Sequence, residues 1–420
     1  MRVVHLLRKY NPAEWGGTET ALQRLFVGLR QHDVDSVVYC PRIPPGSGED
    51  PLARAGCAVR RFDSCVPVWG LSPRRKEEMI AVGGNLLSFN LPVRLWREAS
   101  VSVIHTHTLG RLGGAALRVA KCRRLPFVVT IHGGVFDLPA VLKSAYRAAR
   151  RGWEWGRLFG FLFQARRLFV DADAILACNA IEADALRARH PAKRVLVQPH
   201  GVPAERYRTD CRAAARAAFP ALSDRRLLLC VGRIDPVKNQ GWLIEQAPEI
   251  FRRHPRVLLV LAGACTQADY LATLQQSCRA GGLQDRVLFT GGLPPEDPRL
   301  IGLLQTADAV VLPSLSETFG LVILEAWAAG RPVIAQRTSG ASALIQPGQN
   351  GWLFDLARPE DFHAAVDQAL DQPALATRYG AAGAERVRRD FDTGMLAGKA
   401  KALYAELIEE KHALRHSARR

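Results

Sequence analysis

Two glutamates, Glu317 and Glu325, lie in a segment over residues 316–335 that reads SETFGLVILEAWAAGRPVIA. We predict that a strand ends near Leu312, that a loop carries Glu317, and that a helix begins at Phe319–Gly320. Glu325 then lies on an otherwise apolar helix, where a carboxylate needs a partner; a ribose diol would supply two hydrogen bonds. Because a helix N-terminus favours a phosphate, the segment indicates a nucleotide diphosphate site. A buried structural glutamate is the alternative for Glu325.

Two cations follow the first predicted strand of the second half, in a segment over residues 231–239 that reads VGRIDPVKN. Arg233 can bind two phosphate oxygens with its fork of donors, and Lys238 supplies a point charge. Pro236 suits the first turn of a helix. We therefore predict that Arg233 and Lys238 bind a diphosphate, with two solvated surface cations as the alternative.

A histidine and paired glycines mark strand ends in the first half. Residues 130–134 read TIHGG, which places His132 at the end of a predicted strand. With an unperturbed pKa of about 6.5, His132 could bind a sugar hydroxyl or act as an acid–base group, or it could be a satisfied structural residue. Gly16 and Gly17 precede a predicted helix, where backbone N–H groups can approach an anion. A tight turn is the alternative for this pair.

The elements that position these residues are short apolar runs that alternate with helical segments. Such runs, apolar on both faces, are typical of a parallel sheet covered on both sides. The predicted strands are Val3–Leu7, Ser36–Cys40, Val101–His105, Phe127–His132, Ala174–Cys178 and Val195–Val197, followed by Leu227–Val231, Val257–Ala262, Val287–Thr290, Ala309–Leu312, Pro332–Ala335 and Trp352–Phe354. The pattern predicts an α/β protein of two doubly wound, Rossmann-like domains.

We predict an N-terminal domain over residues 1–198, a C-terminal domain over 199–390, and a C-terminal helix with a basic tail over 391–420 that packs back on the N-terminal domain. In such sheets, ligands bind beyond the carboxyl ends of the strands. We therefore expect the domains to face each other across a cleft that holds the ligands.

Composition restricts the class of protein further. The chain has 57 Lys+Arg against 40 Asp+Glu, a net charge of +17 that suits a polyanion, an anionic membrane or a solvated surface. Its nine cysteines form no C-x-x-C pair, so neither a disulfide framework nor a structural zinc site is indicated. No uncharged apolar stretch of about 18 residues occurs, so we expect no transmembrane helix. We expect a cytoplasmic protein, or one associated with the inner face of the cell membrane.

The motifs resemble those of a known family. The pair Glu317 and Glu325 is similar to the E-x7-E signature of the retaining glycosyltransferases with the GT-B fold, family 4, also called glycosyl transferases group 1. Further motifs follow in that family's order, namely Gly16-Gly17, His132, VGRIDPVKN and Asn350-Gly351 in PGQNGWLF. The resemblance is strong from about Val195 to Phe354 and looser in the N-terminal half.

The resemblance implies transfer of a sugar from a nucleotide diphosphate sugar, linked to UDP or else GDP, with retention of anomeric configuration and no metal or other cofactor. The acceptor would be a glycan or a lipid-linked molecule bound mainly by the first domain, in the synthesis of cell-surface polysaccharide or glycolipid. Carried over by position, the catalytic residues would be His132, Glu317, Arg233 and Lys238. The donor would be bound by Gly16, Gly17, Arg233, Lys238, Glu317, Phe319, Gly320, Leu321 and Glu325.

Four further local features bear on the site or leave alternatives open. Residues 143–170 combine arginines with aromatic residues, so they could lie on an anionic membrane or form a buried helix. Residues 42–84 are expected to be a loop that shapes the acceptor site. Asp171-Ala172-Asp173 spells the D-x-D motif of metal-dependent glycosyltransferases, but it precedes a strand and Asp308 recurs at the matching place, so we predict a turn role. His200 replaces the asparagine common in relatives.

Two other classes of function compete with this interpretation. A non-catalytic polyanion- or membrane-binding α/β protein would use the net charge of +17, but no basic stripe with interleaved aromatics and no nucleic-acid-binding module is evident, so no nucleic acid is expected. A nucleotide-sugar epimerase of the same fold gives no reason for the E-x7-E spacing. A phosphorylase would need a Schiff-base lysine, which nothing in the sequence identifies.

Overall fold

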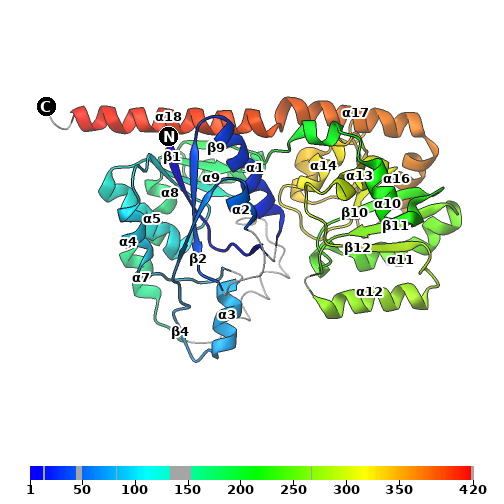
Figure 1. The fold of residues 1–420 in the computed structure, drawn as a ribbon, viewed down its shortest axis with the longest axis horizontal. Helices are drawn as coiled ribbons and strands as arrows, with labels where there is room; N and C mark the ends of the chain where they lie inside the picture. The colour runs from blue at the N-terminus through cyan, green and yellow to red at the C-terminus, as the bar shows by residue number, and fades with distance from the viewer. Residues whose placement is uncertain (13–14, 44–49, 82, 133–152, 266, 418–420) are drawn as a thin grey trace. The chain divides into compact units, whose positions relative to one another are not determined.

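The computed structural model describes the chain except for residues 13–14, 44–49, 82, 133–152, 266 and 418–420. The chain forms two compact units (Figure 1). Unit 1 comprises Met1–His200 and Gly394–Arg420, and unit 2 comprises Gly201–Thr393. Each unit has its own parallel β-sheet and hydrophobic core, which confirms the prediction of two doubly wound α/β domains.

Unit 1 contains a seven-stranded parallel sheet in the order β3-β2-β1-β5-β6-β8-β9. Its strands are β1 (Arg2–Leu6), β2 (Asp35–Pro41), β3 (Ala58–Phe62), β5 (Val103–Thr106), β6 (Phe127–Ile131), β8 (Ala174–Ala177) and β9 (Val195–Val197). Successive residues of β2, such as Val37 and Val38, belong to separate core clusters. The sheet is therefore buried on both faces, which explains the continuously apolar strands.

The helices of unit 1 cover both faces of this sheet. They are α1 (Gly17–Gln31), α2 (Pro51–Arg54), α3 (Pro73–Ala81), α4 (Leu91–Arg97), α5 (Gly110–Arg123), α7 (Arg157–Leu162), α8 (Leu168–Asp171), α9 (Ala180–Arg189) and α18 (Thr393–Ser417). A small antiparallel pair joins β4 (Val68–Trp69) to β7 (Trp153–Glu154). Although α18 follows unit 2 in the sequence, it belongs to unit 1 and runs along it (Figure 1). Its residues Ala397, Tyr404 and Leu407 lie in a core cluster of unit 1.

Unit 2 contains a six-stranded parallel sheet in the order β12-β11-β10-β13-β14-β15. Its strands are β10 (Arg226–Val231), β11 (Val257–Ala262), β12 (Val287–Gly291), β13 (Ala309–Leu312), β14 (Val333–Gln336) and β15 (Trp352–Phe354). Its helices are α10 (Arg212–Ala218), α11 (Gln240–Arg253), α12 (Ala268–Ala280), α13 (Pro298–Thr306), α14 (Leu321–Ala328), α15 (Ser339–Leu344), α16 (Pro359–Asp371) and α17 (Pro373–Asp390). In the described part of the chain, no helix is long and apolar enough to cross a membrane.

Each sheet has one point at which the strand order reverses. In unit 1 the chain builds outward from β1 to β3 and then returns to place β5 on the other side of β1. In unit 2 the corresponding neighbours are β10 and β13. At such a point the loops leave in opposite directions and open a crevice at the carboxyl ends of the strands. The two switch points are therefore where ligand-binding residues are expected.

The expectation of a loop over residues 42–84 is wrong. This stretch contains α2, β3, β4 and α3, and β3 forms the edge of the sheet of unit 1 by pairing with β2. Its sequence, Ala58–Phe62, includes two arginines, so it lacks the continuous apolar character used to find the other strands. An edge strand tolerates such charges because one of its sides is not covered by another strand.

The segment 143–170 is only partly visible, because residues 143–152 lie outside the described part. From residue 157 it forms α7 and α8 rather than one long helix. The break falls at Gln164, which adopts a left-handed conformation with φ of 56°. The alternative of one buried helix over this segment is therefore wrong for the described residues.

The aspartates of the D-x-D segment are used in the fold. Asp173 accepts a hydrogen bond from the backbone N–H of Phe127 at 2.8 Å, and Asp308 accepts one from that of Leu227 at 2.7 Å. Each carboxylate thus ties the start of its own strand to the start of the neighbouring one. Asp171 pairs with Lys121 and Arg167, each at 2.6 Å. These contacts support the turn role predicted from the sequence.

Candidate active site

The site in unit 2 is built from the two loops that leave the switch point. One loop follows β10 over residues 232–239 and the other follows β13 over residues 313–320. The backbone N–H of Leu315 donates to the carbonyl of Val237 at 2.8 Å, and the Asn239 side chain donates to the carbonyl of Pro313 at 3.2 Å. These hydrogen bonds hold the VGRIDPVKN motif against the segment that carries Glu317.

Two of the three predicted catalytic residues in these loops form an ion pair. Lys238 Nζ lies 2.6 Å from Glu317 Oε2, with 23% and 21% of the two side chains exposed. A charge-assisted hydrogen bond of this length, partly removed from water, fixes both side chains. A ligand phosphate would compete with Glu317 for the ammonium group, so this pair can respond directly to a bound anion.

Arg233 lies at the edge of the same site. Its guanidinium is 3.4 Å from Asp235 Oδ2, and its side chain is 42% exposed, which leaves donors open to a ligand. Asp235 is itself buried and accepts a hydrogen bond from the backbone N–H of Val237 at 2.8 Å. Asp235 therefore both shapes the loop and orients Arg233.

The helix α14 begins directly after this loop. Gly320 is its N-cap with φ of 90°, a left-handed conformation that favours glycine, and Leu321 is its first residue. Glu325 lies on the second turn and is only 5% exposed. The Phe319 side chain is buried and contacts the Phe391 ring, so only the backbone of Phe319 can face a ligand.

A third loop, which the sequence did not reveal, supports Glu317. The backbone N–H of Gly340, at the start of α15, donates to the carbonyl of Glu317 at 2.8 Å. The Ser339 hydroxyl donates to the same carbonyl at 3.3 Å. A Cβ atom at Gly340 would lie 2.6 Å from both the Glu317 carbonyl and the Phe319 nitrogen. Glycine is therefore required for this close approach, and a search for glycines after β14 could have found it.

The site in unit 1 is a cluster of histidines at the switch point between β1 and β5. His132 follows β6, and its Nε2 lies 2.8 Å from Nδ1 of His107, which follows β5. His107 Nε2 in turn lies 3.1 Å from Nδ1 of His5 on β1. The ring of His200 stacks on that of His132 with centroids 5.2 Å apart. The sequence predicted only His132 for a functional role.

These imidazoles are held in the neutral form by their surroundings. Burial lowers the pKa of His5 from 6.5 to about 3 and that of His200 to about 4, and Arg24 adds to the effect at His200. Burial first, then the neighbouring His200 and Arg8, lowers the pKa of His132 well below 6.5. His107 is shifted in the same direction by burial and by the surrounding histidines. At neutral pH, His132 can therefore donate or accept a hydrogen bond without carrying charge.

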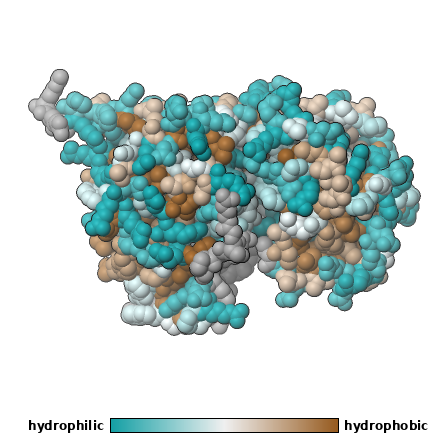
Figure 2. Space-filling model, viewed as in Figure 1, coloured by the Kyte–Doolittle hydropathy of each residue, from teal (hydrophilic) through white to brown (hydrophobic). Residues whose placement is uncertain are grey.

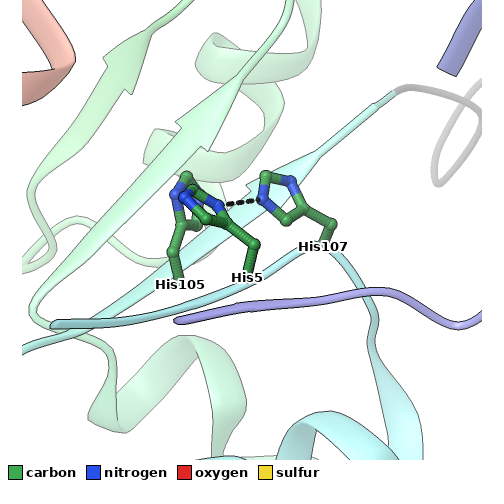
Figure 3. A group of neighbouring side chains, drawn as sticks. All are labelled: His5, His105 and His107. Atoms are coloured by element: carbon green, nitrogen blue, oxygen red, sulfur yellow. Dashed lines mark hydrogen bonds between the residues drawn. The ribbon is translucent and has the colours of Figure 1, made fainter. Parts of the chain in front are cut away.

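His105 belongs to the same cluster but has different partners. It sits opposite His5 in the register of β1 and β5, and His5, His105 and His107 each place one nitrogen within 4.8 Å of the others (Figure 3). Three such nitrogens could hold a metal ion. However, both nitrogens of His105 are within hydrogen-bonding distance of hydroxyls, Tyr404 and Thr130, at 2.6 Å each. A metal ion takes one nitrogen from each ring, so it would have to displace one of these hydroxyls and one of the hydrogen bonds that His107 makes to His5 and His132.

The glycine pair lies at the start of α1. Gly16 is the N-cap, and Gly17 is the first residue of the helix and is exposed. Glu19, in the first turn, is 7% exposed, and a Cβ atom at Gly16 would lie 3.1 Å from its carboxylate. A negative charge thus already occupies the helix end that favours anions. This arrangement weakens the anion-binding role that the sequence predicted for the pair.

Two family models match the chain. "Glycosyltransferase Family 4" matches residues 15–206 and "Glycosyl transferases group 1" matches residues 212–386. Solved structures share the fold along the whole chain. HepE of Anabaena in complex with UDP gives a TM-score of 0.72 at 18% identity, covering 97% of this chain and 100% of that chain. Sucrose-phosphate synthase of Thermosynechococcus elongatus gives 0.71 at 22% identity, covering 97% and 99%.

Curated relatives agree with the family models. D-inositol 3-phosphate glycosyltransferase of Geodermatophilus obscurus is 31% identical over 370 residues, which are 84% of this chain and 77% of the relative. Glycogen synthase of Mycobacterium tuberculosis is 29% identical over 96% of this chain and 94% of the relative. D-inositol 3-phosphate glycosyltransferase 2 of Catenulispora acidiphila is 33% identical, but the match spans only 58% of that protein. With both of its units matched in this way, the chain belongs to the family 4 glycosyltransferases, the glycosyl transferases group 1, with the GT-B fold.

Proposed function

We propose that this protein is a retaining, metal-independent glycosyltransferase that transfers a sugar from a nucleotide diphosphate sugar to a glycan or lipid-linked acceptor. UDP is the preferred nucleotide, because HepE of Anabaena was crystallised with UDP and with UDP-glucose. Cell-surface polysaccharide or glycolipid synthesis is the proposed use. The alternatives are a non-catalytic polyanion-binding protein and a nucleotide-sugar epimerase of the same fold.

The observation that carries this proposal is the Lys238–Glu317 ion pair, 2.6 Å long, beside the N-terminus of α14 at the switch point of unit 2. A departing nucleotide diphosphate accumulates negative charge as the glycosidic bond breaks. Preorganised cations and helix N–H groups directed at that charge stabilise the transition state. Lys238 and Arg233 are the cations proposed to do so here in place of a metal ion.

The remaining site residues take roles that fit their surroundings. Glu325, buried on α14, is proposed to accept hydrogen bonds from the ribose hydroxyls, as the family resemblance implies. Once Lys238 binds the diphosphate, Glu317 is proposed to contact the donor sugar. His132, neutral and at the end of β6, is proposed to hydrogen-bond a sugar hydroxyl. The backbone at Gly320 and Leu321 is proposed to face the phosphates.

The test is the binding and hydrolysis of a panel of UDP-, GDP- and ADP-sugars, each with and without EDTA. We expect saturable binding of one nucleotide sugar, unaffected by EDTA and weakened by Glu325→Gln. The matched control is Glu182→Gln, because Glu182 is likewise a buried helical glutamate, 3% exposed, but lies on α9 of unit 1. Absence of binding by every nucleotide sugar would reject the proposal, and EDTA-sensitive activity would reject its metal-independent part. Inversion of the anomeric centre in the product would reject retention.

A peripheral contact with anionic membrane is proposed for α7 of unit 1. Its Leu158, Phe161 and Leu162 side chains are 71%, 87% and 47% exposed, while Phe89, whose ring lies 5.3 Å from that of Phe159, is 55% exposed. Hydrophobic side chains gather in the same part of unit 1 (Figure 2). Arg118 hydrogen-bonds the carbonyl of Leu162 at 2.9 Å, so a cation borders this apolar surface. Apolar side chains flanked by cations are typical of surfaces that bind anionic lipid.

Vesicle sedimentation tests this contact. We expect binding to phosphatidylglycerol vesicles, weak binding to phosphatidylcholine vesicles, and loss of binding in Phe161→Ser. Leu414→Ser is the control, because Leu414 is 63% exposed but lies on α18 and not on α7. Equal binding by both variants would show that α7 is not the contact surface.

A further inference from the structure

The histidines His5, His107 and His132 form one continuous line of hydrogen bonds. His5 and His107 are joined at 3.1 Å, which Figure 3 marks with a dashed line, and His107 and His132 are joined at 2.8 Å. At one end, His5 Nε2 lies 3.5 Å from the Ser36 hydroxyl. At the other end, His132 Nδ1 is buried and has no hydrogen-bond partner among the described residues. We refer to His5, His107 and His132 as the histidine chain.

A count of protons restricts the histidine chain to two states. Each neutral imidazole carries one N–H, and each N···N hydrogen bond needs one N–H and one bare nitrogen. If His5 donates from Nδ1, then His107 must donate from Nδ1 to His132 Nε2, and His132 must hold its own proton on Nδ1. In the opposite state all three protons lie on Nε2. Every mixed arrangement of neutral rings places two protons or none between one pair of nitrogens.

We propose that His107 and His5 are positioning residues that fix the tautomer of His132, so that the three rings change tautomer together. In one state His132 offers an Nδ1–H donor, and in the other it offers a bare Nδ1 acceptor. A ligand oxygen that contacts His132 Nδ1 therefore selects one tautomeric state for the whole histidine chain. In changing state, the proton in each N···N hydrogen bond passes to the neighbouring ring, one proton is exchanged with the ligand at His132 Nδ1, and one is exchanged in the opposite sense with the Ser36 hydroxyl at His5 Nε2, so the net charge of the three rings stays unchanged.

The surroundings favour this arrangement over two other uses of the cluster. Burial keeps the rings neutral, since the pKa of His5 falls to about 3 and those of His107 and His132 fall well below 6.5. The His105 ring lies beside that of His107, with centroids 4.2 Å apart and a tilt of 33°, but it is engaged by Tyr404 and Thr130 and stays outside the histidine chain. A metal held by His5, His105 and His107 would need a bare nitrogen from each ring at once, which breaks the chain.

The first experiment needs no ligand. The ring nitrogens of uniformly 15N-histidine-labelled full-length protein report the tautomer of each histidine by NMR at pH 7.5, assigned by comparison with single His→Gln variants. We expect His5, His107 and His132 to share one tautomer, all Nδ1–H or all Nε2–H. Different tautomers within the chain, a doubly protonated His107, or stoichiometric metal bound after metal-free purification would overturn the proposal.

The second experiment measures what the coupling does in the proposed transfer reaction. We expect His107→Phe to lower kcat about 10–100-fold, the usual range for a hydrogen-bonding partner behind a site residue, with KM changed less than about 3-fold. Tyr404→Phe is the control: it removes a buried hydroxyl from His105 at 2.6 Å but leaves the histidine chain intact. Its kcat should stay within about 2-fold of the wild-type value. Equal losses of kcat in both variants would indicate general damage to the core and overturn the positioning role.

The two experiments also separate this inference from the proposed function. The kinetic measurement depends on the proposal that His132 contacts the donor, whereas the tautomer measurement does not. If His107→Phe fails to fold, the wild-type tautomers still decide whether the three rings of the histidine chain are coupled. If no nucleotide sugar binds but the three tautomers agree, the proposed function fails while the histidine chain stands.

Discussion

The two units use the same sheet topology but place different chemistry at their switch points. In unit 2, Lys238 and Glu317 form a charged pair 2.6 Å long that is about one-fifth exposed. In unit 1, the corresponding place holds neutral imidazoles, of which His5 is fully buried. Side chains stay charged more readily where water still reaches them, whereas full burial favours the neutral form of a titratable side chain. The same fold can therefore support either fixed charge or neutral hydrogen bonding, depending on exposure.

The largest effect is expected from a fall in pH, which should lower the stability of unit 1 before that of unit 2. A histidine whose pKa is lowered by folding binds fewer protons in the folded than in the unfolded state. It therefore leaves the free energy of unfolding unchanged above pH 6.5 and lowers it as the pH falls toward the folded pKa. For His5, with a pKa of about 3, the loss is about 1.4 kcal/mol for each pH unit below 6.5. His105, equally buried, is shifted in the same direction.

Hydrogen exchange at pH 7 and pH 5, corrected for intrinsic rates, measures this difference. Amides of β1 and β5 in unit 1 should lose several kcal/mol of protection, whereas those of β10 and β13 in unit 2 should lose less. In unit 2, burial lowers the pKa of His363, which lies on α16 and not on those strands. Equal loss of protection in both sheets would contradict the contrast between neutral and charged sites.

Removal of the lysine in unit 2 is expected to have the next largest effect. Lys238→Ala should lower kcat about 100- to 1000-fold, equivalent to about 3–4 kcal/mol, because it removes a preorganised cation from the leaving group. Steady-state kinetics with the nucleotide sugar that binds in the donor panel measures the effect. The control is Lys411→Ala in unit 1, since Lys411 pairs with Asp173 at 2.7 Å and has a similarly exposed side chain, 28%. A similar fall in both variants would show that loss of an ion pair alone explains the result.

A smaller effect is expected from crowding the backbone under Glu317. Gly340→Ala places a Cβ atom 2.6 Å from the Glu317 carbonyl, so the loop must shift, at a cost of about 1–3 kcal/mol in the free energy of unfolding. Both the stability against urea and the affinity for the donor should fall. Gly241→Ala on α11 is the control, because its Cβ would meet only ordinary contacts, 3.6 Å and 3.7 Å from side chains of α12. Unchanged donor binding in Gly340→Ala would show that the loop position does not matter.

The smallest effect is expected from changes to Asp173 and Asp308, which occupy matching positions in the two units. Asp173→Asn and Asp308→Asn each keep a side-chain oxygen that can accept the backbone N–H but remove the charge that pairs with Lys411 or Arg226. Both partly exposed pairs are worth about 1 kcal/mol or less. Urea unfolding of the two variants should therefore give small and similar losses. A loss confined to one unit would show that the matching aspartates are not equivalent.

Most of the fold and half of the site could be predicted from the sequence. Strands buried on both faces are continuously apolar, so the strands that flank Arg233 and Glu317 could be recognised directly. The edge strand β3 escaped because Arg60 and Arg61 interrupt its apolar pattern. The histidine chain escaped because its members are far apart in sequence, as with His5 and His107, which are 102 residues apart. Polar residues within apolar strands, such as His5 in VVHLL, were the signal that could have indicated it.

The sequence by itself determined the local chemistry of this protein. Glu317, Gly320 and Glu325 lie within nine residues of one another, so a single loop and the helix that follows it fix their spacing. Only the tertiary structure decided which distant residues meet. The parallel register of β1 and β5 places His5 opposite His105, and the pairing of β5 with β6 brings His132 beside His107. Such contacts depend on strand order and register, which follow from packing of the whole sheet and not from any one segment.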